Sequence, residues 1–120
     1  MTEPVTLADA FARIDRLWTP HVAAELNGQH VKLAKVQGDF VWHSHADEDE
    51  LFLVVKGALT IHLRDRSVTV GEGALFVVPR GVEHRPEAEE ETWIVLFEPA
   101  GTAHTGDVES ALTVHDLPRI

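Results

Sequence analysis

Two histidines one residue apart, followed by a glutamate and a hydrophobic run, constrain this chain more than any other feature. They are His43, His45 and Glu50, and they lie in a segment that runs from Gly38 to Gly57. In a β-strand, alternate side chains point to the same face, so a strand through His43 and His45 presents both imidazoles to one side. The pair can therefore approach one metal ion together, and Glu50 can add an oxygen ligand.

The rest of the chain is dominated by short strand patterns separated by turns. We expect strands over 22–26, 30–36, 41–45, 51–55, 58–63, 68–70, 74–78 and 92–97. Asn27-Gly28 lies between the first two and favours a type I′ hairpin turn. The runs 51–55 and 74–78 are apolar at every position, as in strands that are covered on both faces. Many short strands with regular turn signals predict an all-β sandwich or barrel.

One helix is expected, over about 6–18 near the N-terminus. Apolar residues recur there at helical spacing, and they are Leu7, Ala10, Phe11, Ile14, Leu17 and Trp18. Thr6 and Asp9 resemble a capping box, and Pro20 ends the pattern. The apolar face of this helix predicts packing on the outside of a sheet, in the core of the monomer or against a second subunit.

Length, charge and cysteine content limit the class of protein. A chain of 120 residues is expected to be a single domain over 1–120, with a barrel over about 22–98 and a tail over 99–120. A net charge of −10 argues against a nucleic-acid surface and an anionic membrane surface. With no cysteine, disulfides and cysteine-ligated zinc are excluded. No signal peptide or membrane-length apolar run is evident, so we expect a cytoplasmic protein.

A second motif lies further along the chain, from Gly73 to His84. It consists of a glycine, five residues, a Pro-x-Gly turn, two residues and a histidine. This motif and the segment from Gly38 to Gly57 resemble the two signature sequences of the cupin superfamily. The whole chain most resembles the small bacterial "cupin 2" proteins.

The resemblance implies a jelly-roll β-barrel in which four residues converge on one divalent metal ion. The implied ligands are His43, His45, Glu50 and His84. Three imidazoles and a carboxylate suit Fe, Mn, Ni, Co, Cu or Zn better than Mg or Ca. The chain departs from the family pattern at two points, with four residues in place of five before His43 and Ala88 in place of the usual Asn. Neither departure removes a ligand.

Apolar side chains are expected to line the cavity around the metal. They are Val41, Phe52, Val54, Leu75, Val77, Ile94 and Leu96. Such a lining favours a small, partly hydrophobic ligand. The acidic residues 47–49 either hold the N–H groups of the histidines or form a solvated loop. His62 is expected to face solvent, and the tail that carries His104 and His115 could bring His104 near the metal.

Three functions fit this pattern. The chain is a metal-dependent small-molecule enzyme of the oxygenase or isomerase type, a non-catalytic module that binds a metal or a ligand, or a dimerisation scaffold with a structural metal. It lacks the glycine-rich nucleotide motifs, a nucleophile elbow and a cysteine nucleophile. We expect a homodimer, and we expect acid below about pH 6 to release the ion, since unperturbed histidines protonate near pH 6.5.

Overall fold

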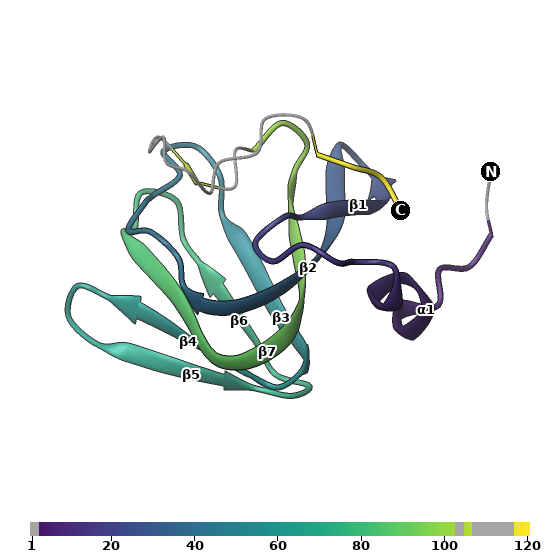
Figure 1. Cartoon of the computed structure of the whole chain (residues 1–120). Helices are drawn as coiled ribbons and strands as arrows, with labels where there is room; N and C mark the ends of the chain where they lie inside the picture. Colours follow the sequence, from purple (N-terminus) through teal and green to yellow (C-terminus); the bar gives the residue numbers. More distant parts are fainter. Residues whose placement is uncertain (1–2, 103–104, 107–116) are drawn as a thin grey trace.

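The computed structural model describes residues 3–102, 105–106 and 117–120. Within these residues one short helix, α1 (Leu7–Ala12), precedes an antiparallel sheet (Figure 1). The strands are β1 (His21–Leu26), β2 (Gln29–Asp39), β3 (Glu50–Lys56), β4 (Ala58–Leu63), β5 (Ser67–Gly71), β6 (Leu75–Val78) and β7 (His84–Pro99). The antiparallel strands and the N-terminal helix confirm the expected all-β class with one helix. No helix in the described part of the chain has the length and apolar content needed to cross a membrane.

The long strand β7 organises the sheet. It pairs with β2 along most of its length, with β4 through its first half and with β3 through its second half. The strand order is β1-β2-β7-β3-β6, and β5 joins on β4. Figure 1 shows β7 bending between its two halves, so that β4 and β5 lie across from β3 and β6. The sheet therefore has an enclosed inner face and an outer face.

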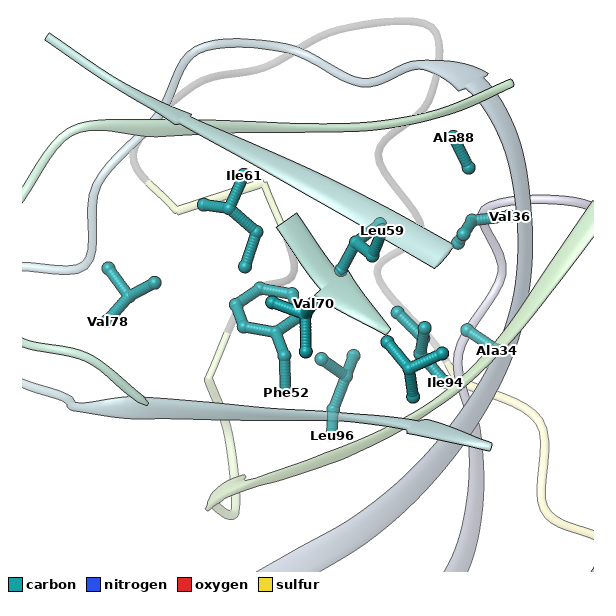
Figure 2. Packing of buried hydrophobic residues seen from close by; sticks show 11 residues of the cluster. Ala34, Val36, Phe52, Leu59, Ile61, Val70, Val78, Ala88, Ile94 and Leu96 are labelled. Carbon is teal, nitrogen blue, oxygen red and sulfur yellow. The ribbon is translucent and has the colours of Figure 1, made fainter. Parts of the chain in front are cut away.

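The inner face carries the main hydrophobic core. The buried side chains that meet there are Ala34, Val36, Phe52, Val54, Leu59, Ile61, Val70, Val78, Ala88, Ile94 and Leu96 (Figure 2). Leu59 and Ile61 come from β4 and face Phe52 of β3, so the core joins the two layers. Full burial of one such side chain contributes about 1.5–3 kcal/mol.

The predicted hairpin is confirmed, whereas one predicted strand is wrong. β1 and β2 pair around Asn27 and Gly28, whose φ angles of 49° and 76° are those of a type I′ turn. The segment 41–45 forms no continuous ladder. Only His43 pairs there, in an isolated antiparallel bridge with His84.

Helix α1 is much shorter than the predicted helix over 6–18. It ends at Ala12, and Leu17 further along forms an isolated bridge with Lys35 of β2. Trp18 has a φ of 56°, a left-handed conformation that a helix cannot contain, and its N–H donates to the carbonyl of Lys35 at 2.9 Å. The apolar pattern therefore extends to Trp18, beyond the end of the helix. There the backbone forms a hydrogen bond with β2 in place of helical hydrogen bonds.

The helix packs on the outer face of the sheet, which is one of the three arrangements left open by its sequence. Phe11 stacks on Trp93 of β7, with ring centroids 4.9 Å apart and an interplanar angle of 14°. Ala10 and Ile14 complete a second buried cluster with residues of β2 and β7. The expected capping box is wrong, because the side chain of Thr6 makes no capping hydrogen bond.

Candidate metal centre

The four predicted ligands meet at one end of the inner face. His43 and His45 lie in the connection between β2 and β3, Glu50 begins β3, and His84 begins β7. One ligand atom from each lies within 4.8 Å of the others. Their exposed fractions are 3%, 5%, 2% and 0% in the order of the sequence. The structure thus brings together all four residues, although metal binding itself stays a prediction.

Backbone hydrogen bonds hold the connection against the start of β7 without a regular strand. The N–H of His43 donates to the carbonyl of His84 at 3.0 Å, and the N–H of His84 donates back at 2.9 Å. Further along, the N–H of Gly81 donates to the carbonyl of His45 at 2.8 Å. These bonds join two segments that are far apart in sequence, and they place the imidazoles of His43 and His84 with centroids 4.2 Å apart.

Two of the imidazoles are oriented by their Nδ1 atoms. Nδ1 of His43 lies 2.8 Å from the carbonyl of Val41, and Nδ1 of His84 lies 3.0 Å from the carbonyl of Val82. A carbonyl oxygen only accepts, so each Nδ1 carries the proton and a neutral ring keeps a lone pair on Nε2. This is the arrangement that metal-ligating histidines adopt.

The chemistry of the donor set fits a cation. Nε2 of His84 lies 3.3 Å from Oε1 of Glu50, and Nε2 of His45 lies 3.4 Å from the same oxygen. Because the proton of a neutral His84 lies on Nδ1, its Nε2 lone pair and the carboxylate oxygen repel each other at this distance. A metal ion between the two groups removes that repulsion.

Burial shifts the acid–base properties of the site. Burial and the neighbouring His84 lower the pKa of His43 to about 4, so its Nε2 is free of a proton at neutral pH. Burial alone would raise the pKa of the Glu50 carboxyl, but the contacts with His45 and His84 outweigh it and hold that pKa well below its usual value. The site therefore offers a deprotonated carboxylate and a neutral imidazole, which are the ligand forms that a metal requires.

An apolar cavity opens onto this centre. It is small, with a volume of about 30 Å³ open to the centre of a water-sized sphere, and its lining residues are Trp18, Pro20, Ala34, Val36, Phe40, His43, Glu50, Phe52, Pro86, Ile94 and Leu96. His43 and Glu50 are the titratable groups in this lining. Trp18 stacks on Phe40 with centroids 4.7 Å apart, and Phe40 meets the edge of the His43 ring. Contacting aromatic rings thus connect the segment before β1 to the candidate metal ligand His43.

Of the seven predicted cavity residues, three line the cavity and four do not. Phe52, Ile94 and Leu96 line the cavity. Val54 is buried in the core, and Val41 is half-buried with its carbonyl bonded to His43.

Two of the four that do not line the cavity face away from it. Leu75 and Val77 are 59% and 44% exposed. They pair with Leu53 and Leu51, whose side chains alternate with the inward Phe52 and therefore face outward.

The acidic loop and His62 lie outside the ligand cluster. Asp49 accepts hydrogen bonds from the N–H and Nε of Arg80, and both side chains are more than half exposed. This arrangement matches the solvated loop. His62, which was expected to face solvent, is half-buried and bonds to Ser67 and Glu87. His104 and His115 lie outside the described residues.

The sequence analysis missed two buried charged residues beside the site, Lys32 and Glu98. Their side chains are 1% and 0% exposed, and Nζ of Lys32 donates to Oε1 of Glu98 at 2.9 Å. Burial raises the pKa of Glu98 well above its usual value, the charge of Glu50 adds to this effect, and Lys32 opposes it. Strand alternation was the available signal, because Lys32 shares a face with Ala34.

Comparisons with known proteins agree with this architecture. The cupin domain family model matches residues 29–98. A cupin-2 domain protein from Shewanella frigidimarina is 46% identical, with a TM-score of 0.78 over 79% of this chain and 93% of its own. Protein NMB1881 from Neisseria meningitidis is 33% identical, with a TM-score of 0.75 over 82% of this chain and 100% of its own.

A further relative is described as uncharacterised, so it assigns no activity to this chain. The uncharacterised protein YdbB from Bacillus subtilis is 38% identical over 63 residues, which is 52% of this chain and 56% of its own length. The chain thus spans little more than half of that relative. With the family model matching more than half of the sequence, and with both signature motifs at the buried cluster, this chain belongs to the cupin domain family.

Proposed function

We propose that this protein is a metal-dependent cupin enzyme that acts on a small, largely apolar molecule. The observation that carries the proposal is the apolar cavity that opens directly onto two of the four candidate ligands, His43 and Glu50. A cofactor site without such a cavity would fit a structural metal, and an apolar cavity without the ligands would fit a binding module. The combination favours chemistry on a bound molecule.

The ligand set supports a divalent transition metal held by His43, His45, Glu50 and His84 inside a closed jelly-roll barrel. Fe, Mn, Ni, Co, Cu and Zn all suit these donors. When bound, such an ion supplies Lewis-acid or redox chemistry to a molecule beside it. The reaction class that we propose is an oxygenation or an isomerisation.

The protein's own residues would bind and orient the substrate. Phe40, Phe52 and Leu96 offer apolar walls, which exclude water and favour an uncharged ring or branched alkyl group. A carboxylate or phosphate in the apolar part of this cavity would be buried without a cationic partner in its described lining. The substrate is therefore neutral away from its metal-binding end.

Metal analysis and turnover test the proposal. The purified protein, reconstituted separately with each of the six metals at neutral pH, is expected to hold close to one ion per chain. Loaded protein is then incubated with neutral phenols, ketones and enols, with and without dioxygen, and products are identified by mass spectrometry. His84→Ala should lose both metal and turnover, whereas His62→Ala, which changes a histidine outside the cluster, should lose neither.

Two outcomes would contradict the proposal. Wild-type protein that binds no metal after reconstitution would remove the centre. A stoichiometric metal with ligand binding but no turnover of any compound would favour the non-catalytic module. The expected homodimer is a separate prediction, and a monomer mass in solution at micromolar concentration would contradict it.

A further inference from the structure

A buried ion pair lies next to the candidate metal centre. Lys32 of β2 donates from Nζ to Oε1 of Glu98 on β7 at 2.9 Å, and to the carbonyl of Thr102 at 3.3 Å. Burying a charged group costs several kcal/mol unless it is paired and hydrogen-bonded. An inward lysine close to a cation site therefore needs a specific reason to be tolerated.

Glu98 lies between Lys32 and the predicted ligand Glu50. In the sheet β7 lies between β2, which carries Lys32, and β3, which begins with Glu50. Leu51 of β3 pairs with Phe97 of β7, and Glu50 and Glu98 are the next residues beyond this pair on the two strands. The carboxyl groups of Glu98 and Glu50 also interact with each other. Glu98 thus contacts the Lys32 ammonium on one side and the Glu50 carboxyl group on the other.

The pairing determines which carboxyl group is left for a metal ion. If Lys32 paired with Glu50, its positive charge would compete with a cation for that carboxylate. In the structure Lys32 pairs with Glu98, and Glu50 is directed toward His45 and His84.

We infer that Glu98 is a positioning residue for the metal centre, because it holds the Lys32 ammonium away from Glu50 and so keeps Glu50 available as a ligand. This inference rests on the metal site of the proposed function. A purely structural ion pair would contribute to folding and leave metal affinity unchanged. The two roles are therefore distinguished by metal affinity in variants that fold.

The first test is the Co(II) affinity of Glu98→Gln, measured by competition with a chromophoric chelator. Glutamine keeps the shape of the side chain and removes its charge, so the ammonium turns to Glu50 and affinity falls about ten-fold or more. The double variant Lys32→Met/Glu98→Gln has no ammonium to compete, and its affinity returns to within about three-fold of wild type. Glu25→Gln, which breaks the exposed pair with Arg119, is the matched control and keeps wild-type affinity.

Several results would overturn the inference. Wild-type affinity in Glu98→Gln would show that Glu98 does not shield Glu50. A double variant as weak as Glu98→Gln would show that Lys32 is not the competitor. Should Glu98→Gln not fold, Glu98→Asp retains a charge for Lys32 and is expected within about three-fold of wild type, and a ten-fold loss there would contradict the role.

The same titrations separate this inference from the proposed function. Absence of Co(II) binding in the wild-type protein would remove the metal centre, and the positioning role with it. Tight binding in the wild type with no effect of Glu98→Gln would leave the metal centre in place and reject the positioning role alone.

Discussion

The two sides of Glu50 differ sharply in their chemistry, although β2 and β7 contribute to both. On one side Val36, Phe52 and Ile94 give an apolar cavity. On the other side the inward positions of β2 and β7 become Lys32 and Glu98, which are fully buried and paired. The apolar side has an open pocket, and the charged side is filled by the ion pair of Lys32 and Glu98. The comparison suggests that one set of residues binds the small molecule and another set positions the metal ligand Glu50.

The largest expected effect comes from the residue that the two sides share. Glu50→Gln should weaken Co(II) binding by more than about 100-fold, beyond the range seen for partners outside the ligand set. The same chelator competition measures it. His62→Ala serves as the control for loss of a titratable side chain elsewhere. Tight Co(II) binding by Glu50→Gln would contradict this prediction, because Glu50 would then not be a metal ligand between the apolar cavity and the Lys32–Glu98 pair.

The charged side should dominate stability. Lys32→Met leaves Glu98 without its partner, and the free energy of unfolding of the metal-free protein should fall by about 3–5 kcal/mol. Arg119→Met breaks an exposed pair with Glu25 and should cost about 0–1 kcal/mol. Urea unfolding of the two variants compares them directly. Equal losses would show that groups other than Lys32 compensate Glu98.

Acid should destabilise the metal-free protein through the candidate ligands. His43 has its pKa lowered to about 4 in the folded state, whereas an unfolded histidine titrates near 6.5. Between these values the unfolded chain binds a proton that the folded chain does not. Stability should therefore fall as the pH drops from about 6.5 to about 4, by about 3 kcal/mol from this group.

Urea titrations across that range test the acid prediction, with His43→Gln as the comparison. The variant lacks the titrating group, so its stability should fall less than that of the wild type over the same window. An equal fall in both proteins would assign the effect to other groups. The low pKa also changes the expectation from the sequence alone, because His43 stays unprotonated well below pH 6.

The candidate ligands could be found from sequence because their signal is local. His43, His45 and Glu50 lie within a few residues of each other, and His84 ends a motif with a Pro-x-Gly turn. Each motif needs only its own segment to be recognised. The sequence did not predict how the two segments meet. A single bridge between His43 and His84 takes the place of the expected strand.

The faces of the apolar strands could not be predicted in the same way. The run 74–78 is apolar at every position, so alternation does not indicate which side chains face inward. Leu75 and Val77 turned out to face outward on β6, at the edge of the sheet. Lys32 posed the opposite problem, because its position indicated the inner face while its charge suggested solvent. Its partner Glu98 is 66 residues away in sequence.

The smallest expected effect on folding is on the apolar side. Ala34 is 2% exposed and lines the cavity, so Ala34→Leu should fill part of the cavity with its added atoms. Overpacking a filled core costs about 1–3 kcal/mol, and the open space beside Ala34 should keep this change near the lower end of that range. The variant should bind Co(II) as the wild type does, yet lose affinity for a neutral fluorinated phenol observed by fluorine NMR.

The outward Leu75 provides the matched control for the cavity variant. Leu75→Ala changes an apolar side chain on the same sheet, but on its outer face, and should alter neither phenol binding nor metal affinity. If Ala34→Leu weakened Co(II) binding as much as Glu98→Gln is expected to, the apolar residues would also position the metal ligands, and the two sides would not have separate roles. If Ala34→Leu lost phenol binding alone, the two sides would have separate roles, because binding in the cavity would change without a change in metal affinity.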